Sequence, residues 1–170
     1  MERLFALFPG ADAALDYEIV PGEDVPEPYR GLLVHEHHMT VTVESYHGSP
    51  VNVWVLERHY DGSYYARKIL LALQSTDKVV QFGIVRMNLD MTSPAVREAI
   101  LAARTPVGRV LIQHNVLRRI EPVAFLKIRP TAEQLAWFGN GVEAEELYGR
   151  LAIIHFEGKP AVELLEIVAP

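Results

Sequence analysis

The sequence predicts an α+β domain in which helices pack against an antiparallel β-sheet. Strand-like runs at 51–60, 64–73 and 79–89 are joined by short polar connections, which is typical of consecutive antiparallel strands. Strand signals return at 116–128, 147–156 and 161–168, after a helical region. Strands and helices do not alternate regularly, so the pattern favours an antiparallel sheet over a parallel one.

The N-terminal part of the chain is predicted to be an irregular lead-in, residues 1–28, to one domain that covers 1–170. Pro9, Pro21, Pro26 and Pro28 interrupt this segment. Apolar residues at helical spacing then predict a helix over 29–36. The strict alternation of Met-Thr-Val-Thr-Val-Glu over 39–44 predicts a strand after it.

Capping residues mark the remaining helices. Ser93 before Pro94 is a helix N-terminus, which predicts a helix over 95–104. Pro106 and Gly108 interrupt it, and a helical segment resumes over 110–114. Another helix is predicted over 131–138, ended by Gly139, and the last two strands form a hairpin that turns at 157–159.

Composition excludes several classes of function. The net charge is −6, so there is no broad cationic surface for nucleic acid or an anionic membrane. The chain has no cysteine, which excludes disulfides and thiolate chemistry. The first residues lack the features of a signal peptide, and no apolar run approaches the ~20 residues of a membrane span. We therefore expect a cytoplasmic protein without nucleic-acid or membrane partners.

Arg67 is the first candidate for a functional residue. Alternation within strand 64–73 places it on one face with Tyr65, Ile69 and Leu71. A guanidinium on an apolar face requires an anion. The alternatives are an internal salt bridge or an edge residue whose charge reaches solvent.

Glu166 is the second candidate, because it shares a strand face with Val162, Leu164 and Val168. Glu163 is a similar carboxylate on the other face. Both could instead be charges that discourage association between sheet edges.

The run His35-Glu-His-His38 suggests a metal site, since imidazoles are common ligands. The other histidines are scattered, so no ligand set is completed, and a polar helix end is the alternative. Phosphate-binding glycine loops are also missing from the sequence. We predict neither a metal nor a cofactor.

Several short strings, taken in order, resemble the chorismate lyase family. They are 32–40 (LLVHEHHMT), 67–71 (RKILL), 105–109 (TPVGR), 158–160 (GKP) and the glutamate four residues before Pro170. The resemblance implies a chorismate lyase-like fold with an enclosed ligand pocket. It also implies a cofactor-free lyase that converts chorismate to 4-hydroxybenzoate and pyruvate.

The resemblance assigns roles to four residues. Arg67 matches the arginine that holds the product carboxylate, and Glu166 matches the glutamate that contacts the phenolic hydroxyl. Met39 and Val107 match residues that line the same pocket. This sequence has one extra residue between Gly-Lys-Pro and the glutamate, and its segment 79–89 lacks the family's tryptophan and Gly-Arg-Thr. Glu163 therefore stays an alternative to Glu166.

The reaction forms an aromatic ring, so it requires orientation and proton transfer more than a cofactor. Arg67 and Glu166 are the expected catalytic pair, with chorismate as the small-molecule partner and a monomer or weak homodimer as the assembly. Two alternatives remain: a non-catalytic module of the same fold that binds a small aromatic acid, and a metal-dependent β-barrel enzyme that uses His35 and His37.

Overall fold

The computed structural model describes residues 2–8, 15–139 and 142–169, and one sheet organises them. Within these residues the sheet has seven strands in the order β1-β5-β6-β7-β4-β3-β2. Every neighbouring pair is antiparallel. The strand bounds are β1 Asp16–Val20, β2 Val51–Asp61, β3 Tyr64–Leu73, β4 Val79–Asn88, β5 Arg118–Arg129, β6 Leu147–Phe156 and β7 Lys159–Val168.

Two meanders make up this sheet. Strands β2, β3 and β4 follow one another through short turns. In the second set a longer connection with two helical segments joins β5 to β6, and a tight turn joins β6 to β7. The pairing of β4 with β7 joins the two sets. The edges are β1 and β2, so the sheet is open. The predicted antiparallel α+β class and all six predicted strand runs from 51 onward are confirmed.

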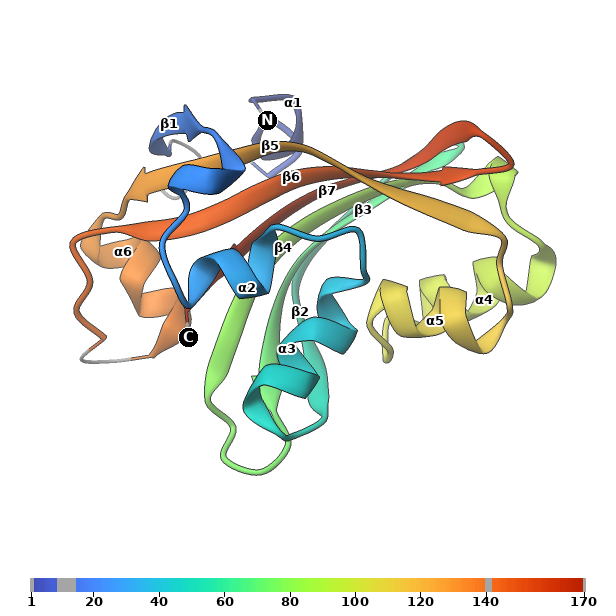
Figure 1. The fold of residues 1–170 in the computed structure, drawn as a ribbon. Helices are drawn as coiled ribbons and strands as arrows, with labels where there is room; N and C mark the ends of the chain where they lie inside the picture. The colour runs from blue at the N-terminus through green and yellow to red at the C-terminus, as the bar shows by residue number, and fades with distance from the viewer. Residues whose placement is uncertain (1, 9–14, 140–141, 170) are drawn as a thin grey trace.

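Helices cover the concave face of the curved sheet (Figure 1). The α-helices there are α2 Tyr29–Leu33, α3 Met39–His47, α4 Pro94–Ala102 and α5 Val107–Gln113. Helices α4 and α5 connect the two meanders, and Ser93 caps α4 through the amide of Val96, as expected. The remaining helical segments are α1 Glu2–Phe5, η2 Gly22–Asp24, η3 Leu89–Met91, α6 Ala132–Leu135 and η4 Ala136–Phe138.

Both faces of the sheet are buried by apolar side chains. On the face away from α3 and α5, Phe82 stacks on Trp137 of η4 with ring centroids 3.8 Å apart. On the helix-covered face, Leu71 and Val168 pack against Leu33 and Val43. No helix among the described residues is long and apolar enough to cross a membrane.

The strand predicted over 39–44 is wrong, because these residues begin helix α3. Met39, Thr40 and Val43 are buried, and this i, i+1, i+4 pattern belongs to a helix face. The β-branched residues favour a strand locally, yet packing against the sheet overrides that preference. Gly48, with φ +62°, ends the helix in the left-handed conformation that glycine adopts readily.

The prediction of an irregular lead-in over 1–28 also needs correction. Residues 16–20 form β1, which pairs with β5 from Asp16↔Arg129 to Val20↔Phe125. The strand is short, lies at the sheet edge and is largely exposed, so it lacks the buried alternation by which the longer strands were found. The lead-in therefore extends the sheet by one edge strand.

Candidate functional site

A cavity lies between the helix-covered face of the sheet and the N-terminal ends of α3 and α5. Its volume is about 50 Å³, far below the ~300–1,000 Å³ of sites for drug-sized ligands. Arg67, Glu166, Met39 and Val107 all line it. The structure thus brings the four sequence-predicted site residues to one place.

Strand register determines which side chains form the cavity floor. One cross-strand row contains Arg67, Val85 and Leu164. The next row contains Ile69, Gly83, Glu166 and Arg150, and a third contains Leu71 and Gln81. Arg67 and Glu166 thus project from β3 and β7, which flank β4 and lie about 10 Å apart by ordinary strand spacing.

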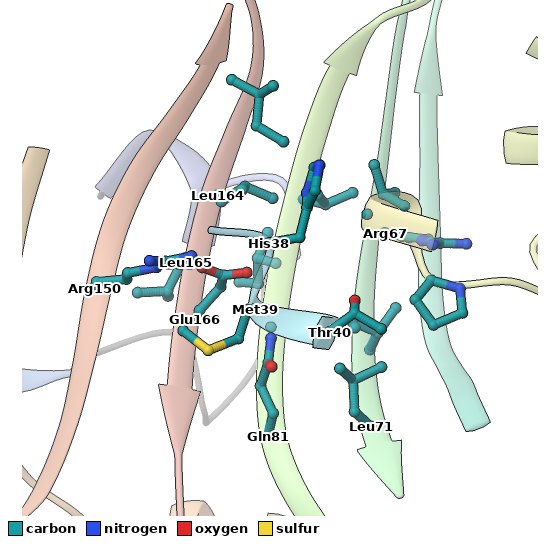
Figure 2. Close-up of a pocket in the computed structure, with 18 of the residues that line it drawn as sticks. His38, Met39, Thr40, Arg67, Leu71, Gln81, Arg150, Leu164, Leu165 and Glu166 are labelled. Atoms are coloured by element: carbon teal, nitrogen blue, oxygen red, sulfur yellow. Dashed lines mark hydrogen bonds and ion pairs between the residues drawn. The ribbon is translucent and has the colours of Figure 1, made fainter. Parts of the chain in front are cut away.

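Arg67 is almost completely buried at one side of this cavity (Figure 2). Its Nη2 donates a 2.9 Å hydrogen bond to the carbonyl of Thr105. Its Nε and Nη1 have no hydrogen-bond partner among the described residues. Burial lowers the pKa of Arg67, an effect that the nearby Tyr65 side chain partly opposes. An arginine nevertheless stays protonated in a protein, so the cavity wall presents a cation with two unused donors.

The Thr105-Pro-Val-Gly-Arg109 segment lies beside Arg67, and its three central residues line the cavity. The Thr105 carbonyl orients Arg67, and Val107 begins α5 at the cavity. A Cβ at Gly108 would lie 3.0 Å from Nδ1 of His38, so glycine lets α5 approach this histidine without displacing its side chain. Arg109 pairs with Glu44 of α3. Segment 105–109 therefore positions the cationic group and, through the pair of Arg109 with Glu44, connects α5 to α3.

Glu166 lies at the other side of the cavity, 7% exposed. Its Oε2 accepts a 2.7 Å hydrogen bond from Nε of Arg150, with which it forms an ion pair. Glu163 instead faces the other side of the sheet, where it pairs with Arg86 at 3.4 Å. Of the two glutamates, the structure places Glu166 at the cavity.

Arg150 is a site residue that the sequence analysis missed. Its side chain is fully buried, and besides Glu166 it donates to the carbonyls of Leu33, His35 and His37. It thus ties the loop between α2 and α3 to the pocket carboxylate. The sequence carried a signal for Arg150, because strand alternation places it on one face with Tyr148 and Ala152. The same argument identified Arg67.

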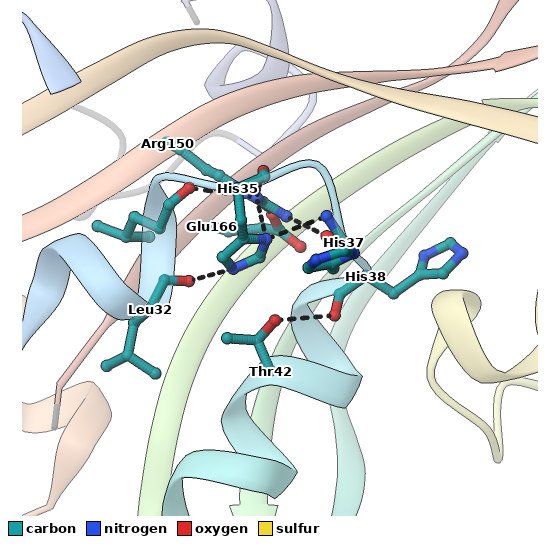
Figure 3. A network of polar contacts seen from close by, with 8 residues as sticks. Leu32, His35, His37, His38, Thr42, Arg150 and Glu166 are labelled. Atoms are coloured by element: carbon teal, nitrogen blue, oxygen red, sulfur yellow. Dashed lines mark hydrogen bonds and ion pairs between the residues drawn. The ribbon is translucent and has the colours of Figure 1, made fainter.

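The histidine run lies in this loop and has a structural role (Figure 3). His35 Nε2 lies 2.7 Å from the Leu32 carbonyl, so Nε2 carries the proton and donates. Its Nδ1 accepts from the amide of His37 at 3.1 Å and lies 3.3 Å from Nη1 of Arg150. Both ring nitrogens are occupied by protein groups. Among residues 2–8, 15–139 and 142–169, no group of three or more His, Cys, Asp or Glu side chains could hold a metal ion.

Burial and neighbouring arginines keep two of these histidines neutral. Desolvation, followed by the charge of Arg150, lowers the pKa of His35 to about 4. Desolvation, followed by Arg118 and Arg150, lowers the pKa of His38 to about 4. The two imidazoles are therefore uncharged at neutral pH, which agrees with the acceptor role of His35 Nδ1.

Acid should destabilise the fold through these histidines. In the unfolded chain both histidines have a pKa near 6.5. As the pH falls from 6.5 to 4, the unfolded chain therefore takes up more protons than the folded chain, and the free energy of unfolding decreases. We expect roughly 1–2 kcal/mol from His38, allowing for its partial contact with solvent. Urea titrations at pH 7 and 4.5 measure this loss. It should shrink in His38→Asn and persist in His114→Asn, an exposed control; equal losses in both variants would contradict the assignment.

No protein-family model matches this sequence, and no curated protein matches it. Solved structures do resemble it. PhnF from Mycobacterium smegmatis matches with a TM-score of 0.59 at 9% identity, over 79% of this chain and 64% of that one. This chain therefore spans less than two thirds of that protein.

Two further structures match a larger share of their own length. One is the ligand-binding domain of a Bordetella bronchiseptica protein classed in the GntR family of transcriptional regulators, with a TM-score of 0.53, 12% identity and coverage of 71% and 83%. The other is a Staphylococcus aureus gene product, with a TM-score of 0.52, 10% identity and coverage of 70% and 82%. These likenesses show the fold alone, and they confirm the α+β class with an antiparallel sheet and packed helices that the sequence predicts.

Proposed function

We propose that this chain binds a small ring carboxylate in the cavity and acts on it as a chorismate pyruvate-lyase. The observation that carries this proposal is Arg67, a buried cation whose Nε and Nη1 are without acceptors and which lines the same cavity as Glu166. A buried guanidinium with unused donors favours a carboxylate, which it can bind through two parallel hydrogen bonds.

The cavity lining carries the groups that the reaction requires, and the cavity, about 50 Å³ in this structure, widens when the ring enters. Chorismate loses a proton from the ring carbon that bears the hydroxyl, its ether bond to the enolpyruvyl group breaks, and the released enolate takes up a proton to give pyruvate. Arg67 holds the ring carboxylate, and Glu166, which pairs with Arg150, is the group that accepts a proton. Met39 and Val107 form apolar walls that hold the ring in place.

A second function is favoured by the comparisons. One structure that resembles this chain is described as the ligand-binding domain of a GntR-family regulator. The same cavity without turnover would make this chain a binding module for a small aromatic acid. In both functions Arg67 binds the carboxylate of the ligand. Only the lyase then converts the bound ligand into products.

Turnover of chorismate separates the two functions. The purified chain is incubated with chorismate, and 4-hydroxybenzoate and pyruvate are identified by retention time and mass. Equimolar formation of both products above the rate of a boiled sample supports the lyase. Tight binding of 4-hydroxybenzoate without any turnover supports the binding module and rejects the lyase.

Arg67→Met should weaken 4-hydroxybenzoate binding by roughly 10- to 100-fold, the size of a lost charge-assisted hydrogen-bond pair. The methionine retains most of the volume and removes a buried charge, so the variant should fold and melt no lower than the wild type. Calorimetric titration measures the affinity. Arg58→Met is the matched control, because Arg58 is the exposed cross-strand partner of Arg67 on β2. Unchanged affinity in Arg67→Met would refute the anion site.

A further inference from the structure

Gln81 is a buried polar residue to which the proposed reaction assigns no role. It lies in β4 on the cavity floor and is 3% exposed. Its Oε1 has no hydrogen-bond partner among the described residues. Figure 2 shows its amide directed along β4 into the cavity, between Met39 and Thr40.

An amide in this position is unfavourable for folding alone. A buried carbonyl oxygen without a partner costs about 1–3 kcal/mol, and buried polar groups in folded proteins are nearly always hydrogen-bonded. Leucine or methionine would fit the same apolar surroundings without that cost. The residue therefore fits a cavity whose occupant supplies the missing hydrogen bond.

The neighbours of this amide define where the occupant lies. Nε2 of Gln81 lies 3.6 Å from the position that a Cβ at Gly83 would take. Gly83 is the direct cross-strand partner of Glu166. The amide of Gln81 and the carboxylate of Glu166 therefore border the same space above Gly83, where the floor has no side chain.

Arg67 lies on the other side of this space. The cross-strand row that contains Arg67 lies two residues along the strands, about 7 Å, from the row that contains Gly83. The row that contains Gln81 lies on the opposite side of the Gly83 row. A ligand held by its carboxylate at Arg67 thus extends over Gly83 and ends between Gln81 and Glu166.

We propose that Gln81 and Glu166 form a subsite for two adjacent polar substituents at the end of the ligand opposite its carboxylate. Glu166 accepts a hydrogen bond from one hydroxyl, and the Gln81 amide binds the group on the neighbouring ring carbon. This inference rests on the proposed function: the enolpyruvyl ether that chorismate carries on that carbon has only acceptor oxygens, to which Nε2 of Gln81 donates. A hydroxyl on the same carbon also donates to Oε1 and so supplies its missing partner. Gln81 then contacts this substituent and determines specificity for it.

Binding of a ring-acid panel tests the subsite. We use 4-hydroxybenzoate and 3,4-dihydroxybenzoate, which differ by one substituent next to the hydroxyl. The wild type should bind the dihydroxy acid about tenfold more tightly, the size of one added hydrogen bond. In Gln81→Met this preference should disappear while 4-hydroxybenzoate affinity changes little. Equal affinities in the wild type, or a preference that survives in Gln81→Met, would overturn the subsite.

The melting temperature of Gln81→Met is a second measurement, and it distinguishes a ligand-binding Gln81 from one that only stabilises the fold. Gln81→Met removes an amide oxygen that has no donor among the described residues, so its melting temperature should equal or exceed that of the wild type. Gly83→Ala should also fold, because the added Cβ meets ordinary contacts of 3.4–3.6 Å, and its methyl group should reduce affinity for both acids. A lower melting temperature in Gln81→Met would show a structural amide and overturn the proposal.

The same panel separates this inference from the lyase. A wild-type preference that Gln81→Met abolishes, together with no chorismate turnover, supports the subsite and rejects the lyase alone. Chorismate turnover with equal affinities for the two acids rejects the subsite alone. Failure of the wild type to bind either acid, with no turnover, rejects both.

Discussion

Arg150→Met should lower the free energy of unfolding by about 3–5 kcal/mol, the usual cost of removing one partner from a buried ion pair. The substitution leaves the buried carboxylate of Glu166 without its 2.7 Å donor. It also removes the donor to three carbonyls of the loop between α2 and α3. Urea unfolding at pH 7, followed by circular dichroism, measures the loss.

A double variant separates the charge from the loop contacts. In Arg150→Met with Glu166→Leu neither buried charge remains, so part of the lost stability should return. The remainder reports on the three carbonyls, which would stay without a donor. Arg86→Met is the matched control, because Arg86 pairs with Glu163 on the other face of the sheet at 3.4 Å and its carboxylate partner is partly exposed. Losses of equal size in Arg150→Met and Arg86→Met would contradict a special role for the buried pair.

Local patterns predict most of this fold because most of its strands are long and several of them are joined by short turns. Strand runs of ten or more residues, such as β3 and β7, carry enough alternation to be recognised alone. Helix α3 was missed because Thr and Val at every second position imitate a strand, and only contact with the sheet selects the helix. Strand β1 has only five residues, most of them exposed, and its pairing with β5 joins residues more than a hundred positions apart in the sequence.

Patterns within single strands predicted individual residues of the candidate site, but not how those residues meet. Alternation and family resemblance indicated Arg67 and Glu166, and both line the cavity. Their relation depends on register between strands that are distant in the chain, for which a single sequence carries no signal. The same limit hid the pairing of Arg150 with Glu166, and it hid the meeting of Gln81 with Gly83 and Glu166 in one space.

Glu166→Gln should reduce chorismate turnover by roughly 10²- to 10⁴-fold, the usual contribution of a positioned acid–base group. The amide keeps the shape of the side chain, and its oxygen can still accept from Nε of Arg150. It cannot take up a proton. We therefore expect 4-hydroxybenzoate affinity to stay near that of the wild type and stability to fall less than in Arg150→Met.

Glu163→Gln is the control for this substitution, because it makes the same chemical change on the same strand outside the cavity. Glu163 is bound by Arg86 as Glu166 is bound by Arg150, so both variants lose one ion pair. Only the loss at Glu166 removes a carboxylate from the space above Gly83. A large loss of turnover confined to Glu166→Gln, with product affinity retained, assigns proton transfer to this residue. Near-normal turnover in Glu166→Gln would leave Glu166 an orienting role only, and an equal loss in Glu163→Gln would attribute the effect to weakened strand β7.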